Sequence, residues 1–230
     1  MSSNVMQEYL AEAYRIAHYQ KDDPYVTTSA LAERMHVTAP AVAAVVQRLK
    51  KRGLVEHEPY RGIKLTEKGE HNALMNIRRH RLAEIFMVKV MGFGWHEVHD
   101  EADALGEVIS EQVAARMEVM AGFPKRCPHG EPIPTADGVM PPIHDEPLSD
   151  LTAPRELSIS RVNTHEPDLL QYLASLSLVP GQPIQLISRA PFNGPLRLKI
   201  GVQEQVIGYE LARVLRVEPL DEVRTANTSP

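Results

Sequence analysis

Two groups of histidine and carboxylate side chains near the middle of the chain have the residue types and spacing of ligands for a divalent cation. In the stretch VHDEADALGE, His99, Asp103 and Glu107 recur every four residues and therefore share one face of a predicted helix. Upstream, His80 and Glu84 have the same spacing, which points an imidazole and a carboxylate in one direction. Carboxylates four residues apart repel each other by roughly a few tenths of a kcal/mol, and a bound cation would relieve that repulsion.

Each group also has an ordinary explanation that needs no metal. Acidic residues in the first turn of a helix are favoured by the helix dipole. The pair His80 and Glu84 lies beside Arg78, Arg79 and Arg81, as a surface ion pair would. The elements that surround these residues must therefore decide between the two interpretations.

The pattern of apolar residues predicts a mostly α-helical chain with a small β domain at its C-terminal end. Residues 4–121 are helical in periodicity, with apolar positions 6, 9, 10, 13, 16 and 17 in the first helix and a long helix over 67–92. Residues 122–154 are rich in proline and carry little periodicity, as expected of a linker. Residues 155–220 alternate as short strands, with one helix in EPDLLQYLASL, which favours a small β-barrel.

Within the helical part, residues 28–65 have the order of elements of a winged helix-turn-helix. A helix capped by hydroxyls at 28 and 29 is followed by a break at 36 and 37. A second helix begins at Thr38, has Pro40 in its first turn and ends at Gly53. Two short strands around PYRG complete the motif. Between residues 44 and 64 there are six basic residues against two acidic ones, so this part has a local basic face.

This motif predicts binding to double-stranded DNA, with small residues that allow close approach to the groove. The expected contacts come from Thr28, Thr38, Ala39, Pro40, Ala41, Arg48, Lys51 and Arg61. The helix start has no Arg, Asn or Gln to read a base with a bidentate hydrogen bond, so DNA shape is expected to carry more of the specificity. The alternatives are an alanine-rich packing helix and a protein-interaction module.

Composition excludes several other classes of protein. The net charge of −5 argues against general coating of nucleic acid, no apolar run approaches the ~20 residues of a membrane span, and the N-terminal stretch does not have the pattern of a signal peptide. We therefore expect a cytoplasmic protein with no membrane partner. The single Cys127 excludes an internal disulfide framework and a cysteine-based zinc site. No phosphate loop or nucleophile motif is present, so neither an enzyme nor a small-molecule substrate is expected.

Five stretches, in this order, resemble the diphtheria-toxin-repressor family of metal-dependent transcriptional regulators: EYLAEAYRI, VTAPAVAAVVQRLKKRGLVEHEPYRGIKLTEKG, RRHRLAEIF, VHDEADALGEVIS and CPHGEPIP. The resemblance implies a homodimer that binds Fe(II) or Mn(II) and then a palindromic operator, repressing metal-uptake genes. It also implies a domain division. The DNA-binding domain would span 1–70, the helical metal-binding and dimerisation domain 71–122, the linker 123–154, the SH3-like (FeoA-like) domain 155–222 and a tail 223–230.

The resemblance further implies two metal sites. His80, Glu84 and His99 match an ancillary site that the C-terminal domain completes, here through Glu166. A second ligand from that domain is often an amide, but Leu169 stands there, so Asp168 or His165 is the alternative.

The implied primary site consists of Glu8, Asp103 and Glu107, while Ala11 and Gly106 replace carboxylates of the family. These ligands are all oxygen, which suits Mn(II), with Fe(II) as the alternative. A cation held there would fix the first helix against the dimerisation helices.

Three questions stay open at the level of sequence. Cys127 and His129 in the linker either form a second, softer metal site or fix a turn. A metal-independent winged-helix regulator that senses a small molecule would leave the acidic cluster unexplained. A metallohydrolase that uses His80, Glu84, His99 and Asp103 is the least favoured alternative.

Overall fold

The computed structural model describes residues 3–20, 23–106, 108–152 and 154–220. Contacts divide the chain into two compact units, and the boundary crosses a helix between His80 and Arg81. The first unit comprises the described residues of 1–80, 103–114 and 133–141, and the second comprises those of 81–102, 115–132 and 142–230. The two units are described separately below.

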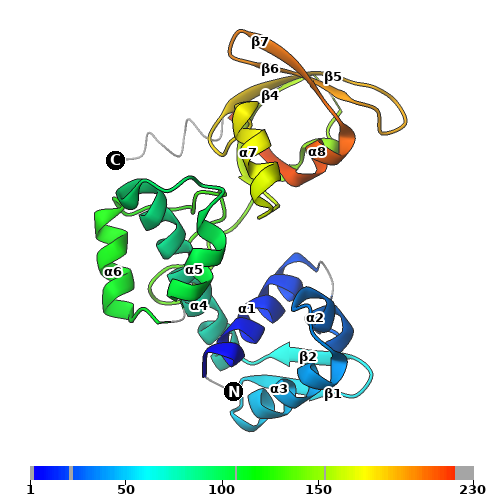
Figure 1. The fold of residues 1–230 in the computed structure, drawn as a ribbon. Helices are drawn as coiled ribbons and strands as arrows, with labels where there is room; N and C mark the ends of the chain where they lie inside the picture. Colours follow the sequence, from blue (N-terminus) through cyan, green and yellow to red (C-terminus); the bar gives the residue numbers. More distant parts are fainter. Residues whose placement is uncertain (1–2, 21–22, 107, 153, 221–230) are drawn as a thin grey trace. The chain divides into compact units, whose positions relative to one another are not determined.

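The first unit is a winged helix-turn-helix, as the sequence predicted (Figure 1). Its elements in chain order are α1 (Ser3–Tyr19), α2 (Thr28–Arg34), α3 (Ala39–Lys51), β1 (Val55–Glu58), β2 (Gly62–Leu65) and the first part of α4 (Glu67–Phe86). β1 and β2 form an antiparallel hairpin in which Val55 pairs with Leu65 and Glu58 with Gly62. This hairpin is the wing of the fold.

Local capping explains where the helices of the first unit begin and end. α2 is capped by Thr27, whose Oγ1 accepts a hydrogen bond from the amide of Ala30 at 3.1 Å, so the predicted caps at 28 and 29 are wrong by one and two residues. Thr38 takes the N-cap position of α3, but its side chain makes no capping bond. Gly53 follows the end of α3 with φ of 68°, a left-handed conformation that glycine adopts without strain.

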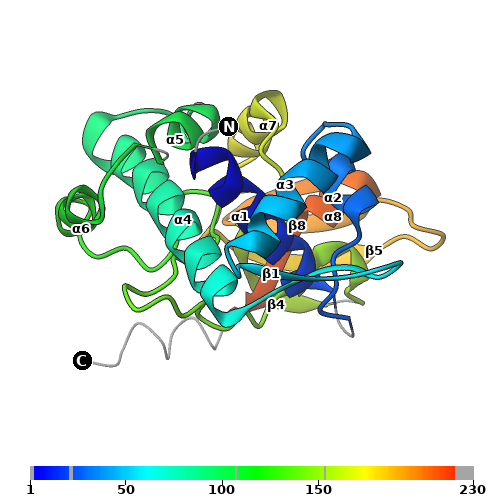
Figure 2. The same cartoon turned by 90° about the horizontal axis from the view of Figure 1, so that it is seen from below.

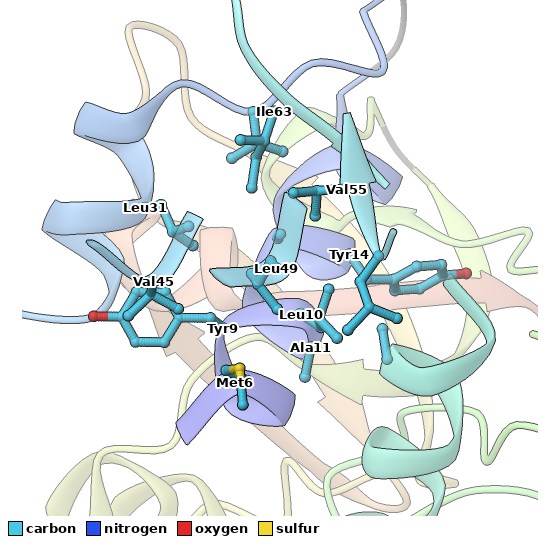
Figure 3. Packing of buried hydrophobic residues seen from close by; sticks show 14 of the residues in the cluster. Met6, Tyr9, Leu10, Ala11, Tyr14, Leu31, Val45, Leu49, Val55 and Ile63 are labelled. Atoms are coloured by element: carbon cyan, nitrogen blue, oxygen red, sulfur yellow. The ribbon is translucent and has the colours of Figure 1, made fainter. Parts of the chain in front are cut away.

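The core of the first unit is built on the apolar stripe of α1 (Figure 3). Met6, Tyr9, Leu10 and Ala13 are buried, and residues 16 and 17 pack at the margin, which confirms the predicted helical face. Leu31, Val45, Leu49 and Ile63 bring α2, α3 and the wing onto this stripe (Figure 3). Each such side chain, when fully buried, contributes about 1.5–3 kcal/mol, so the wing and α3 are held to α1 mainly by apolar packing.

The second unit contains the rest of α4, which Figures 1 and 2 show as one continuous helix, and the C-terminal β domain. α4 passes into a π-helical turn (Met87–Met91) that ends at Gly92. Two further helices also have parts in both units: α5 (Val98–Gly106) and α6 (Glu111–Met120). The β domain contains β3 (Glu146–Pro147), a short 3₁₀ turn (Leu148–Asp150), β4 (Arg155–Val162), α7 (Pro167–Ser175), β5 (Pro183–Arg189), β6 (Leu196–Ile200), β7 (Gln203–Ile207), α8 (Tyr209–Val214) and β8 (Leu215–Pro219).

The six strands form one antiparallel sheet in the order β3-β8-β4-β5-β6-β7. Among the described strands β3 and β7 remain the two edges, so the small C-terminal β domain is confirmed but its sheet is open rather than a closed barrel. Residues 205–220, predicted as strand throughout, contain α8 between β7 and β8. Leu170 and Leu173 of α7 and Ala212 of α8 pack into the core of this domain.

No helix among the described residues has the length and apolar character needed to cross a membrane.

Candidate metal centre and DNA-binding surface

Glu84 lies at the centre of the candidate metal site, on a part of α4 where the carboxylate is only 1% exposed. One turn earlier on the same helix lies His80, and α5 adds His99. The ligand atoms of His80, Glu84 and His99 lie within 4.8 Å of one another. His99 Nδ1 is 3.4 Å from Glu84 Oε1. The structure therefore brings together the three residues that the sequence grouped as the ancillary site.

A second group shares Glu84 and is completed by Cys127 and His129, and all three residues are buried. The CPHG turn that carries them is fixed by backbone hydrogen bonds, because Gly130 N donates to Cys127 O at 2.9 Å and Val162 N of β4 donates to His129 O at 2.9 Å. The residues form a tight turn, as one sequence alternative predicted, and this turn also presents a thiol and an imidazole to Glu84, so the softer metal site stays a prediction.

His129 supplies the observation that most directly indicates a cation. Its ring is fully buried, and Nε2 lies 2.9 Å from the carbonyl oxygen of Trp95, so this nitrogen is assigned the proton. Nδ1 then carries a lone pair; it faces Glu84 Oε1 at 3.3 Å and has no hydrogen-bond partner among the described residues. Two buried acceptors that face each other need a proton or a cation between them. The donor set of the described residues therefore fits a divalent cation.

Cys127 completes a mixed set of sulfur, nitrogen and oxygen donors. Burial raises the pKa of its thiol well above the usual value, and the nearby charge of Glu84 raises it further. The cysteine is therefore a protonated thiol unless a cation is present to stabilise the thiolate. One cysteine is enough for such a mixed site, which is the softer metal site that the sequence offered as one alternative for Cys127 and His129.

The C-terminal domain contributes His165 to the surroundings of this cluster. The His165 ring stacks on His99 with centroids 3.8 Å apart and meets the His129 ring edge-on at 5.2 Å. Glu166, the predicted ligand, is exposed at the N-cap of α7 and belongs to neither candidate group. Of the residues that the sequence offered from this stretch, His165 is thus the one beside the other imidazoles.

The predicted primary site is only partly described. Glu8 is exposed on α1, and Asp103 Oδ1 lies 2.8 Å from His80 Nδ1. Glu107 lies outside the described residues. Gly106 is buried, and a Cβ at this position would lie 3.4 Å from His80 Cα, so the missing carboxylate coincides with close packing of α5 on α4.

A buried network of charges holds the turn that carries Cys127 and His129. Arg161 Nη1 donates to Glu131 at 2.8 Å, and Arg161 Nε donates to Asp145 at 2.6 Å. Arg81 of α4 also donates to Glu131, at 3.1 Å, and Arg216 of β8 donates to Asp145 at 2.9 Å. Burial raises the pKa of Asp145, but the hydrogen bond and charge of Arg161 outweigh burial, so the net pKa lies below the usual value. The network thus stabilises an ionised Asp145.

The exposed face of α3 is the candidate DNA-binding surface. Among the predicted contacts, Thr38, Ala39, Pro40, Arg48 and Lys51 are exposed. Thr28 and Ala41 are half-buried, and Arg61 is exposed in the wing. Sequence reasoning did not single out Gln47, which is exposed on this face and has both a donor and an acceptor. The sequence could have indicated this exposure, because Gln47 follows Ala44 by three residues and so lies on the helix face opposite the buried valines.

Comparisons with known proteins agree with this arrangement. The chain matches the models for the iron dependent repressor N-terminal DNA binding domain (residues 1–63), the iron dependent repressor metal binding and dimerisation domain (residues 66–135) and the FeoA domain (residues 146–219). It is 30% identical over 221 residues to the iron-dependent repressor IdeR of Mycobacterium tuberculosis strain H37Rv, covering 90% of this chain and 96% of that protein. The chain belongs to the iron-dependent (diphtheria-toxin) repressor family.

Other members of the repressor family give the same result. The diphtheria toxin repressor of Corynebacterium diphtheriae is 27% identical, with 91% of this chain and 96% of that protein covered. A solved manganese-dependent transcriptional repressor in complex with manganese has a TM-score of 0.84 and 32% identity, covering 94% of this chain and all of that one.

The family membership settles the class of protein. The chain is a metal-dependent transcriptional repressor with a DNA-binding domain, a dimerisation domain and an SH3-like FeoA domain. The alternatives of a metal-independent regulator and a metallohydrolase are wrong, because the relatives and the similar structures are metal-dependent repressors and not enzymes.

Proposed function

We propose that this repressor responds to Mn(II), with Fe(II) as the alternative, and that the metal-bound homodimer binds a palindromic operator and represses metal-uptake genes. The observation that carries the metal dependence is the buried pair of facing acceptors, His129 Nδ1 and Glu84 Oε1, at 3.3 Å. Similar solved repressor structures hold manganese, zinc or cadmium, so this fold accepts several divalent cations. The predicted oxygen ligands Glu8, Asp103 and Glu107 favour Mn(II).

The proposed ligands fall into two sets that His80 connects. His80, Glu84, His99, Cys127 and His129 would hold one cation, with His165 beside them and the predicted ligand Glu166 next to it in the chain. Glu8, Asp103 and Glu107 would hold the other. His80 Nδ1 pairs with Asp103 at 2.8 Å, so one imidazole contacts a member of each set. A bound cation supplies positive charge that neutralises these carboxylates.

The first helix is the element that we expect to respond. Glu8 lies on α1 and Asp103 on α5, and Glu107 is the residue that follows α5 in the sequence, so carboxylates gathered from these positions would repel one another when no cation balances them. Neutralising them allows α1, and with it α3, to keep one position. Two α3 helices of a dimer then enter successive major grooves. A coupling of ~1–3 kcal/mol gives roughly 5–150-fold tighter operator binding.

On the DNA side, the proposed contacts are those of α3 and its neighbours. The set consists of Thr28, Thr38, Ala39, Pro40, Ala41, Arg48 and Lys51, with Arg61 in the wing. The exposed alanines present only methyl groups and small volume, so close approach of the helix backbone, contacts to thymine methyls and DNA shape would carry most of the sequence preference.

An electrophoretic mobility shift experiment with an operator duplex tests the proposal. The duplex is selected from a random-sequence library by the Mn(II)-loaded wild-type protein. The wild type is compared in Mn(II), Fe(II), Co(II), Zn(II) and chelator with the variants Glu8→Ala and Asp103→Ala. Glu101→Ala, which removes an exposed carboxylate of α5 outside the predicted ligands, is the matched control.

We expect Mn(II) to give the strongest retardation of the duplex, and chelator to abolish it. Both ligand variants should remain dimers by light scattering but lose the response to Mn(II), while Glu101→Ala keeps it. An unchanged metal response in Glu8→Ala and Asp103→Ala would refute the assigned primary site.

A further inference from the structure

The tip of the wing carries a strained and fully exposed tyrosine. Tyr60 lies between β1 and β2 with φ of 68°, and its relative exposure is 107%. The left-handed region is unfavourable for a bulky residue and is adopted routinely only by glycine, asparagine and aspartate. Because this side chain contacts so little of the protein, packing does not compensate the backbone strain. Such an uncompensated outlier is a reason to look for a function outside the folded chain.

The neighbouring Arg61 is held within the protein. Its guanidinium donates to Glu58 and to Asp23, each at 3.2 Å, and its Cζ lies 3.9 Å from the centre of the Tyr25 ring. These contacts run from the wing to the segment before α2, so they fix the direction in which the hairpin projects (Figure 1). The charge of Arg61 is therefore largely balanced by two carboxylates.

The charges of the wing as a whole cancel. Glu56 and Glu58 on β1 oppose Arg61 and Lys64 around β2, and Glu56 pairs directly with Lys64 across the hairpin. A wing without net positive charge gains little from general attraction to phosphates. It can still contact DNA through a neutral donor that extends beyond the carboxylates. The phenolic hydroxyl of Tyr60 is such a donor, since tyrosine hydroxyls bind phosphate oxygens.

We propose that Tyr60 also contacts the operator directly, with its hydroxyl donating to a backbone phosphate beside the groove that α3 enters, and that the contacts of Arg61 with Glu58 and Asp23 hold the wing in position for it. The inference rests on the DNA binding of the repressor and adds a contact that the α3 surface does not supply. Because the donor is neutral, its contribution is independent of counterion release. The Tyr60 contact should therefore respond to salt differently from a contact made by a basic residue such as Lys51.

The test compares operator binding by Tyr60→Phe and Tyr60→Gly with that of the wild type, using the library-selected duplex and Mn(II). Phe192→Gly is the matched control, because Phe192 is also fully exposed in a hairpin loop with φ of 57°, but it belongs to the β domain. Glycine relieves the same kind of strain at both positions. Each variant is also examined by thermal denaturation and light scattering.

We expect Tyr60→Phe and Tyr60→Gly to bind about tenfold more weakly, the loss that corresponds to one hydrogen bond to a charged acceptor. Tyr60→Gly should unfold no earlier than the wild type, and the slope of log affinity against log salt should stay unchanged, whereas Lys51→Ala reduces it by about one. Phe192→Gly should bind like the wild type.

Wild-type affinity in both Tyr60 variants, with Lys51→Ala weakened, would overturn the inference while leaving DNA binding intact. A wild-type protein that selects no duplex would instead contradict the proposed function. If Tyr60→Gly is less stable than expected, Tyr60→Phe alone decides, because it keeps the ring and removes only the hydroxyl.

Discussion

Substitution of Gly130 by alanine should displace the turn that carries Cys127 and His129, and so weaken metal binding. It has φ of +88°, and a Cβ added there would lie 2.1 Å from the carbonyl oxygen of Ser160 and 2.6 Å from Arg161 Cα. Carbon and oxygen normally approach to about 3.3–3.6 Å. Gly130→Ala must therefore move the CPHG turn away from β4 by about 1.2 Å or more, which carries Cys127 and His129 away from Glu84.

A matched glycine allows the two costs of this substitution to be separated. Gly181 has φ of +87°, and nothing lies within 4 Å of a Cβ added to it. Alanine in the left-handed region costs about 1–2 kcal/mol at either position. Displacement of packed backbone adds about 1–3 kcal/mol at Gly130 alone. For a chain of this size, that difference lowers the melting temperature of Gly130→Ala by about 2–12 °C relative to Gly181→Ala.

Metal binding should separate the two variants further. Groups that orient metal ligands typically contribute 10–100-fold to affinity. We therefore expect Gly130→Ala to bind Mn(II) about 10–100-fold more weakly in competition with a chelating dye, while Gly181→Ala binds like the wild type. Equal melting temperatures and equal Mn(II) affinities in the two variants would refute the assignment of the CPHG turn to the metal site.

Three further predictions follow from other parts of the structure. Asp145→Asn should cost about 3–5 kcal/mol because it removes the negative charge that faces both Arg161 and Arg216, leaving Arg161 with Glu131, and chemical denaturation should show no such loss for the exposed control Asp150→Asn. The pKa of Asp145 is lowered in the folded protein. Its contribution to folding stability is therefore complete above the unfolded pKa of about 3.9 and is lost as the pH falls through the folded pKa. In acid denaturation the wild type should lose this part of its stability, whereas Asp145→Asn has none of it to lose. Cys127→Ser should weaken binding of Zn(II) and Co(II) more than that of Mn(II), since thiolate favours softer cations, and equal losses for all three in calorimetry would argue against a sulfur ligand. Gln47→Ala should relax base preference at one operator position by about 1–3 kcal/mol in a repeated library selection, whereas uniform weakening would indicate a phosphate contact instead.

The elements that sequence predicted well are those whose signals are local. The apolar stripe of α1, Pro40 at the start of α3 and Gly53 after its end each act within one or two turns of helix. The same holds for His80 and Glu84, because four residues on one helix fix their relative direction. Predictions of this kind needed no knowledge of tertiary contacts.

The features that sequence missed depend on residues far apart in the chain. Cys127 and His129 lie in a proline-rich stretch without periodicity, and nothing local shows that the CPHG turn docks on β4 and faces Glu84. The stacking of His165 on His99 likewise joins separate elements. α8 was taken for strand because its apolar residues continue the alternation of β7, although Gly208 marks the break.

The central claim is that divalent cations held by the buried cluster around Glu84 and by the proposed set of Glu8, Asp103 and Glu107, which His80 connects, convert the repressor into its DNA-binding form. The most direct test is a titration of operator affinity against free Mn(II), by fluorescence anisotropy, for the wild type and for Glu84→Gln. Glutamine keeps the shape of a side chain that is 1% exposed and removes its charge. The account predicts that wild-type affinity rises about 5–150-fold with Mn(II), and that Glu84→Gln, folded and dimeric, needs about 10–100-fold more Mn(II) for the same rise. Coincident titration curves for the two proteins, or wild-type affinity unchanged in chelator, would contradict it.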